Sequence, residues 1–175
     1  MTDTPEAGFS KRRDAILAEL TAAATPPPHL VAVSKTQDDA ALDEALAAGH
    51  RIFGENRVQE TKLHWDARRE RFPDLELHLI GPLQTNKAED AVRLFDIIQT
   101  LDRAKLADAL AAAISKTGKT PRLLIQVNTG EEPQKAGVSP SEMPVLLEHA
   151  RARGLVVSGL MCIPPVGEPA GPHFA

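Results

Sequence analysis

The sequence is poor in cysteine, in aromatic residues and in long apolar runs. Cys162 is the only cysteine among 175 residues, and tyrosine is absent. A single cysteine excludes an intramolecular disulfide, fits a reducing cytoplasm and is most often a small buried side chain. No apolar run approaches the roughly 18 residues that suggest a membrane span, and the polar, acidic N-terminus is unlike a secretory signal. These absences predict a cytoplasmic protein that does not cross a membrane.

An excess of positive charge and metal-ligand spacing are also missing. The chain has 20 basic and 24 acidic residues, a net charge of −4, so it gives no electrostatic reason to expect nucleic acid as a partner. His29, His78 and His149 lack metal-ligand spacing to cysteines or carboxylates, which argues against a zinc site. Hydrophobic residues make up 42% and charged residues 25%, and these fractions with this length indicate one globular domain.

What the sequence does contain is a regular alternation of strand and helix patterns. Residues 8–24 predict a helix that three consecutive prolines end, so we expect residues 1–28 to form an N-terminal helix and a Pro-rich linker. Six strands are predicted at 29–35, 51–54, 75–81, 96–100, 122–128 and 155–161, with helices at 38–48, 56–71, 86–94, 103–116 and 139–153. This alternation predicts βαβ units and a parallel sheet.

Two architectures contain such a sheet, an open doubly wound sheet and a (β/α)8 barrel. The first strand-to-helix turn, residues 34–37, has no glycine, which argues against a Rossmann phosphate loop. Polar residues gather at the C-terminal ends of several strands, where barrels assemble their sites. We therefore predict an α/β fold of the TIM-type (β/α)8 barrel class, incomplete, with about six βα units and without the last two strands.

Lys35 is the most informative residue. It ends the run Val31-Ala-Val33, and side-chain alternation places it on the same face as both valines. If that face points inward, the amine lies at the mouth of an apolar barrel, where burial lowers the pKa of a lysine. A neutral amine can attack an aldehyde, so Lys35 is a candidate Schiff-base lysine. The alternative is a solvated lysine just past a strand end.

Five motifs occur in order at the strand ends. They are Val31-Ala-Val-Ser-Lys-Thr36, Phe53-Gly-Glu-Asn-Arg-Val-Gln-Glu60, His78-Leu-Ile-Gly-Pro-Leu-Gln-Thr-Asn-Lys87, Gln126-Val-Asn128 with Lys135-Ala-Gly137, and Gly159-Leu-Met-Cys-Ile-Pro164. Together they closely resemble the YggS/PROSC family of pyridoxal 5′-phosphate (PLP) homeostasis proteins. The resemblance implies a barrel like the N-terminal domain of alanine racemase, with PLP held as a Schiff base on Lys35. It also implies PLP-dependent apoenzymes as partners and a monomer at full length.

Four further residues each have two interpretations. Asn56 either donates to a ring substituent of PLP or caps the next helix. His78, inside the third strand, is either a polar group beneath the cofactor or a buried histidine satisfied by a backbone group. Met161, at the end of the sixth strand, either packs near the ring or belongs to the core. Lys135 is either a transient acceptor of PLP or an exposed loop residue.

The resemblance stops just past Pro165. In the family two more strands follow, and they supply the phosphate cradle and a polar partner near the pyridine nitrogen. Barrels commonly bind phosphate after strands seven and eight. Residues 29–175 are therefore predicted to be a truncated PLP-binding barrel from a longer parent, with weakened affinity for PLP.

Two functions fit these observations. The first is PLP binding for intracellular PLP homeostasis, without catalytic turnover, because racemases of this type bring a second domain and a catalytic tyrosine. The second is a Schiff-base-forming TIM-barrel enzyme that acts on a small phosphorylated metabolite. Borohydride trapping separates them, since PLP and a sugar phosphate leave different adducts on the lysine.

Overall fold

The computed structural model describes residues 8–174, which form a helix followed by six consecutive strand–helix units. Ala175 and residues 1–7 lie outside this part. The helices are α1 (Phe9–Ala23), α2 (Asp39–Ala47), α3 (Val58–Arg71), α4 (Ala88–Leu94), α5 (Ala104–Thr117), α6 (Met143–Ala152) and α7 (Gly171–Phe174), with a short 3-10 helix η1 (Thr85–Lys87). The strands are β1 (Ala32–Val33), β2 (Ile52–Glu55), β3 (Glu76–Leu79), β4 (Ile97–Leu101), β5 (Arg122–Val127) and β6 (Val157–Cys162).

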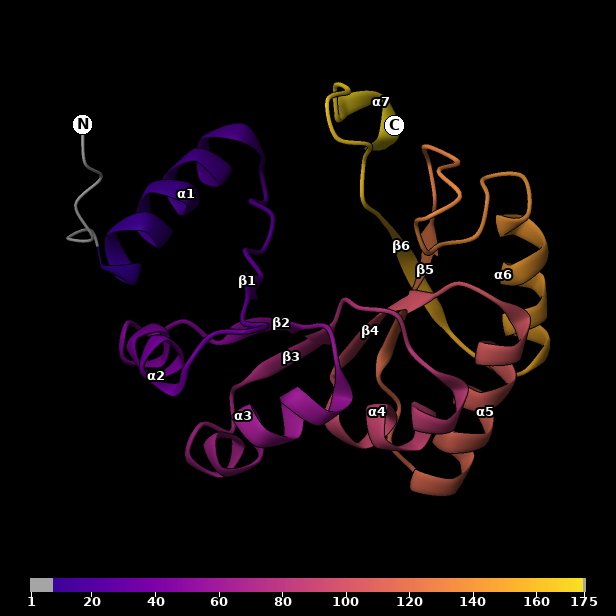
Figure 1. The fold of residues 1–175 in the computed structure, drawn as a ribbon, viewed down its shortest axis with the longest axis horizontal. Coiled ribbons are helices and arrows are strands. Elements are labelled where there is room, and N and C mark those ends of the chain that lie inside the picture. The colour runs from indigo at the N-terminus through magenta and orange to yellow at the C-terminus, as the bar shows by residue number, and fades with distance from the viewer. Residues whose placement is uncertain (1–7, 175) are drawn as a thin grey trace.

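The six strands form one parallel sheet in the order of the sequence, from β1 to β6 (Figure 1). Each strand pairs with the next, for example with His78 opposite Ile97 between β3 and β4. The first and last strands do not pair with each other, so the sheet is open. The prediction of about six parallel βα units in an incomplete ring is confirmed. Because all strands are parallel, their C-terminal ends meet at one edge of the sheet.

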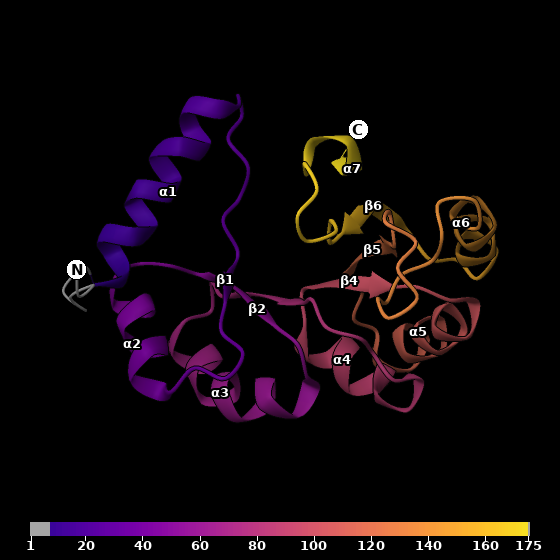
Figure 2. The same ribbon diagram turned by 45° about the horizontal axis from the view of Figure 1, so that its top comes forward.

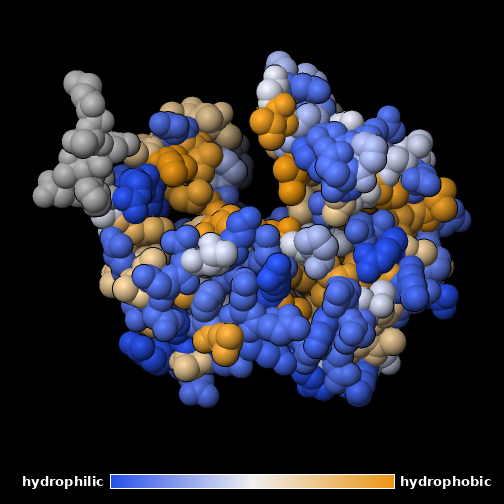
Figure 3. Space-filling view, in the orientation of Figure 1, coloured by the Kyte–Doolittle hydropathy of each residue, from blue (hydrophilic) through white to orange (hydrophobic). Residues whose placement is uncertain are grey.

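The helices divide the sheet into a covered face and an open face (Figure 2). Helices α2 to α5 lie together on one side, and the strand residues that face them, including Phe53, Leu77 and Ile125, are fully buried. The opposite face carries α1 at one end and α7 at the other. Figure 3 shows the surface hollowed between α1 and the C-terminal segment, with hydrophobic residues along it. The exposed hydrophobic side chains include Ile16 and Phe174 of these two helices.

A buried carboxylate on the covered face joins β1, β2 and α3. The Oε1 atom of Glu55 accepts hydrogen bonds from Ser34 Oγ at 2.8 Å and from Trp65 Nε1 at 3.0 Å. His64 Nδ1 lies 3.0 Å from the same oxygen, and Trp65 also packs on the Phe53 ring. Since Ser34 directly precedes Lys35 in the chain, this cluster fixes the point from which the lysine emerges.

Two predicted elements differ from the structure. β1 pairs only over Ala32–Val33, because its register with β2, in which Ala32 lies opposite Phe53, places residues 29 and 30 beside residues that precede β2. Helix α6 begins at Met143 rather than at residue 139, because Pro144 has no amide hydrogen to continue the turn that Ser139 starts. The division of the chain at residue 28 stays a prediction.

None of the helices within residues 8–174 has the length and apolar character that a membrane crossing requires.

Two hydrogen bonds attach the start of helix α1 to α2 and to the turn after it. Phe9 donates its amide to Glu44, and the Arg13 guanidinium donates to the carbonyl of Ala48.

Burial of His50 predicts a pH-dependent stability. Desolvation lowers the pKa of His50 below its ordinary 6.5, a contact with the carbonyl of Ile52 opposes the shift, and Arg13 and Arg51 add to it. Protons therefore bind the unfolded chain more readily, and the free energy of unfolding is expected to fall as pH drops below about 6.5. Urea titrations between pH 7.5 and 5.5 measure this. His50→Gln should flatten the dependence, and the exposed His29→Gln should not; equal slopes in both variants would contradict the assignment.

Candidate functional site

A cavity of about 440 Å³ lies on the open face at the C-terminal ends of the strands. Its lining residues come from every strand or the segment just after it. They are Lys35, Asn56, Ile80, Gly81, Pro82, Gln99, Gln126, Val127, Asn128, Lys135, Ala136, Met161, Cys162 and Ile163. Three of the four predicted site residues, Lys35, Asn56 and Met161, are thus brought together from β1, β2 and β6. The volume falls within the usual range for small-molecule sites.

Lys35 lines this cavity from the turn that follows β1. The lysine shares this cavity with residues of the open face such as Gln99 and Gln126. The predicted burial is wrong: Lys35 is exposed, and Val33 on the same face is 49% exposed. The reason is that β1 is an edge strand, with no strand paired to its outer side among the described residues. The amine is therefore accessible both to the cavity and to solvent.

Asn56 follows β2, and the structure excludes one of its two interpretations. Helix α3 begins at Val58, its N-cap is Arg57, and no side chain caps it. The predicted helix cap is therefore wrong. The side chain of Asn56 is half-buried against the cavity and makes no hydrogen bond with the described residues. Its amide remains available to a ligand.

His78 lies on the open face beside the cavity but is not one of its lining residues. It is buried, and its partners are side chains rather than the predicted backbone group. Its Nε2 is 2.7 Å from Glu76 Oε1, and its Nδ1 is 2.7 Å from Gln99 Nε2. Of these residues only Gln99 reaches the cavity. A direct contact of His78 with a cofactor stays a prediction, and its observed role is to hold Gln99.

Two glutamines of the cavity, Gln99 and Gln126, are not among the site residues that the sequence predicts. Gln126 Nε2 donates to the carbonyl of Ala136 at 3.2 Å, while its Oε1 is buried without a partner. The signal that could have found both residues is a polar side chain inside an otherwise apolar strand. Such a position needs a hydrogen-bonding partner in the protein or in a ligand.

The loop after β5 brings a second amine to the cavity. Val138 returns to the end of β5, where its amide donates to Gln126 O and its carbonyl accepts from the amide of Asn128. Lys135, between them, forms an ion pair with Glu132 at 2.6 Å and donates to the carbonyl of Pro164 at 3.1 Å. The predicted exposed loop lysine is therefore wrong, because Lys135 is half-buried and anchored.

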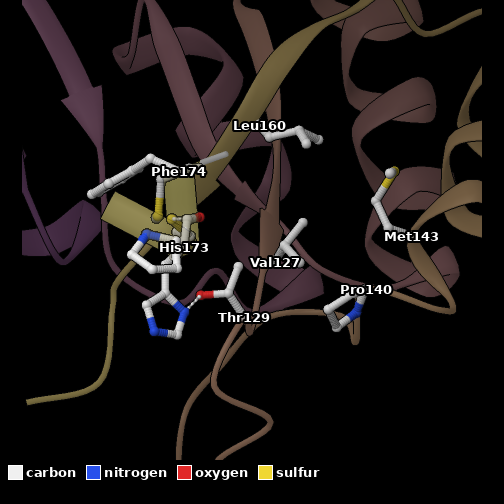
Figure 4. Close-up of a pocket in the computed structure, with 10 residues that line it drawn as sticks. Val127, Thr129, Pro140, Met143, Leu160, His173 and Phe174 are labelled. Atoms are coloured by element: carbon white, nitrogen blue, oxygen red, sulfur yellow. Dashed lines mark hydrogen bonds between the residues drawn. The ribbon is translucent and has the colours of Figure 1, made fainter. Parts of the chain in front are cut away.

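A larger cavity of about 650 Å³ lies between β5, β6, α6 and α7 (Figure 4). Its walls are mainly apolar, with Leu160 and Met143 among them. Its one histidine, His173, is already engaged, since Nδ1 contacts Thr129 at 3.0 Å and Nε2 contacts Glu168 at 3.2 Å. None of the described residues that line this cavity is a lysine, whereas the smaller cavity has Lys35 and Lys135. Cys162 and Met161 border both cavities.

The close approach of Gly81 to Asn56 supports a stability prediction. A Cβ atom on Gly81 would lie 2.3 Å from the Asn56 carbonyl oxygen and 2.6 Å from its Cα. Gly81→Ala should therefore displace Asn56 and lower the free energy of unfolding by about 1–3 kcal/mol. Denaturant titration measures the loss. Gly171→Ala is the control, because nothing lies within 4 Å of its added Cβ. Similar stabilities of the two variants would contradict the prediction.

The cavity offers some, but not all, of the groups that PLP requires. Lys35 supplies a primary amine for the aldehyde, and the side chains of Asn56 and Met161 lie within the same cavity. The buried, unpaired Oε1 of Gln126 is a polar atom that a ligand could satisfy. Among the described residues that line the cavity, Lys135 is the only other cation. Within residues 8–174, no group of three His, Cys, Asp or Glu side chains could hold a metal ion.

Comparisons with known proteins agree with this geometry. The pyridoxal phosphate homeostasis protein of Haemophilus influenzae is 44% identical over 137 residues, which cover 77% of this chain and 57% of that protein. The chain thus spans less than three fifths of this relative. PipY of Synechococcus elongatus PCC7942 is 40% identical, with 90% of this chain and 73% of PipY covered. Its structures without PLP and with PLP bound have TM-scores of 0.78 and 0.77.

The fold also matches more distant proteins. Alanine racemase of Clostridium difficile 630 is 10% identical, with 94% of this chain and 43% of the racemase covered at a TM-score of 0.65, a likeness of fold alone. The predicted resemblance to PLP homeostasis proteins and to the alanine racemase barrel is confirmed. Residues 14–173 match the family described as alanine racemase, N-terminal domain. The chain therefore belongs to the alanine racemase N-terminal domain family.

Proposed function

We propose that this chain binds PLP in the 440 Å³ cavity, joined to Lys35, and serves intracellular PLP homeostasis. The observation that carries the proposal is that Lys35 and two other predicted site residues, Asn56 and Met161, line one cavity although they come from three different strands. The names of its relatives support it, since the Haemophilus influenzae relative is a PLP homeostasis protein and PipY has been solved with PLP bound.

Each residue has a defined task in this proposal. Lys35 would hold PLP through its amine nitrogen, which can condense with an aldehyde with loss of water. Asn56 would donate its amide N–H to a ring substituent, and Met161 would pack against the ring. PLP supplies an aldehyde and an electron-withdrawing ring. The exposure of Lys35 leaves the bond to the cofactor open to water or to an incoming amine, which suits release of the cofactor better than its retention.

The proposal includes no catalytic turnover, a cytoplasmic location and PLP-dependent apoenzymes as recipients. A racemase of this fold needs a second proton-transferring group opposite the lysine, and the chain has no tyrosine to act as one. The proposed site has no catalytic residues in this sense. Incubation with PLP and L-alanine should therefore give no D-alanine above the rate of free PLP, whereas clear racemisation would contradict this part.

Borohydride reduction tests the binding proposal. After incubation with PLP and reduction, peptide mass spectrometry should find the pyridoxyl-phosphate mass on the peptide containing Lys35. A parallel incubation with phosphorylated sugars tests the alternative of a Schiff-base enzyme on a small phosphorylated metabolite. Stable modification of Lys35 by a sugar phosphate, with none by PLP, would replace the proposed function by the alternative.

A further inference from the structure

Three side chains on the open face are connected by hydrogen bonds, and the last of them lines the cavity. Glu76 and His78 are two residues apart on β3, so they point to the same face, and Gln99 reaches His78 from the neighbouring strand β4. An ionised carboxylate only accepts hydrogen bonds, so the ring nitrogen next to Glu76, His78 Nε2, carries the proton. The other nitrogen, Nδ1, faces the amide nitrogen of Gln99, which can only donate, so Nδ1 is the acceptor of that pair.

This tautomer sets the orientation of Gln99. The group that meets an accepting Nδ1 must be a donor, which is the amide nitrogen Nε2 of Gln99, 2.7 Å away. The amide oxygen Oε1 of Gln99 then has no partner among the described residues, and it belongs to a side chain that lines the cavity. The Glu76–His78 pair thus leaves a free acceptor at the cavity wall.

Gln126, on the neighbouring strand β5, also has an engaged amide nitrogen and an unpaired amide oxygen. Its amide nitrogen is engaged by the carbonyl of Ala136 at 3.2 Å, in the loop that folds back over the end of β5. Its Oε1 is buried and unpaired, on a side chain that is 95% buried and lines the same cavity. A buried acceptor without a partner costs free energy, so a ligand that donates to it gains affinity.

From these contacts we infer that Gln99 and Gln126 are specificity-determining residues that accept hydrogen bonds from a donor group on the bound ligand, and that His78 and Glu76 are positioning residues for Gln99. The inference rests on the proposed function and deepens it. On PLP the donor is either the ring hydroxyl or the protonated ring nitrogen. Both present the same chemistry to an amide oxygen, and two analogues separate them.

The experiment measures the affinity of the full chain for three compounds by absorbance titration. They are PLP, its 3-O-methyl analogue, which lacks the hydroxyl donor, and its 1-deaza analogue, which lacks the ring nitrogen. We expect one analogue to bind about 10-fold more weakly than PLP, because a buried acceptor is left unpaired. In Gln126→Met and Gln99→Met, whose side chains keep the length but lose the oxygen, this preference for PLP should shrink to less than about 3-fold.

His78→Phe tests the positioning role through the ratio of the affinity for PLP to the affinity for the analogue. Loss of the Nδ1 acceptor frees the Gln99 amide to turn, so the preference for PLP over the analogue should fall as in Gln99→Met. A purely structural role of His78 would weaken PLP and the analogues equally and leave the ratio unchanged. Gln134→Met, an exposed position in the loop after β5, is the control and should keep the wild-type ratio.

The outcomes distinguish this inference from the function on which it rests. Equal affinity of the wild-type chain for PLP and both analogues would overturn the inference while leaving PLP binding intact. A preference for PLP that persists in both glutamine variants would also overturn it. Failure of the wild-type chain to bind PLP at all would overturn the proposed function, and the inference with it. A preference that is lost in the glutamine and histidine variants supports both.

Discussion

Replacing Lys35 by alanine is expected to abolish the PLP adduct that borohydride traps on the chain. The cavity has two amines, but Lys135 is held by Glu132 and by the carbonyl of Pro164, whereas the described contacts leave Lys35 without a hydrogen-bonding or ion-pair partner. A primary amine without such contacts can approach an aldehyde directly, whereas the amine of Lys135 would first have to leave Glu132 and the carbonyl of Pro164. Intact-mass measurement after reduction should therefore show one added pyridoxyl-phosphate in the wild type and none in Lys35→Ala.

Two further variants make this test specific. Lys35→Arg keeps the positive charge but not the primary amine, so it should also lose the adduct. Lys105→Ala, at an exposed position on α5 away from the cavity, should keep it. An adduct of wild-type yield in Lys35→Ala, mapped to Lys135, would show that the anchored amine is the reactive one and would contradict the assignment.

Trp65→Ala is expected to lower the free energy of unfolding strongly. The indole is fully buried, packs on Phe53 with ring centroids 4.4 Å apart, and donates to the buried carboxylate of Glu55. Truncating such a side chain leaves a cavity and removes a donor from Glu55, so the free energy of unfolding should fall by about 3–5 kcal/mol. Guanidinium titration measures it.

The matched control lies on the same helix. Leu63→Ala removes an apolar side chain that is 84% exposed, and surface changes of this kind usually alter stability by less than about 0.5 kcal/mol. A loss in Trp65→Ala no larger than that in Leu63→Ala would contradict the view that the Glu55 cluster ties α3 to the first two strands. Glu55→Gln separates packing from charge, since it keeps the volume and one acceptor.

The order of elements could be predicted from the sequence because each strand is a short apolar run bounded by a helix pattern. That Lys35, Asn56 and Met161 would come together could be predicted as well, since the strands are parallel and all three residues lie at strand ends. The length of β1 could not, because pairing depends on where β2 begins, and alternation within one strand contains no information about its neighbour's register.

The contacts of the polar side chains could not be predicted from the sequence either. His78 takes its partners from its own strand and from β4, and this choice follows from register and rotamer rather than from spacing. The exposure of Lys35 follows from the open edge beside β1. Gln99 and Gln126 were visible as polar residues in apolar strands, yet their role depends on which amide atom is already engaged.

Binding of a ligand in the cavity is coupled to the stability of the whole sheet. Lys35 follows the first strand and Met161 belongs to the last, so a molecule that fills the cavity touches both outer strands of the sheet at once. Occupancy and folding are then linked equilibria. At a ligand concentration 100 times the dissociation constant, the folded chain gains about 2.7 kcal/mol over the unfolded one. The melting temperature should therefore rise with free PLP concentration, so that the supply of the cofactor would set the fraction of the chain that is folded.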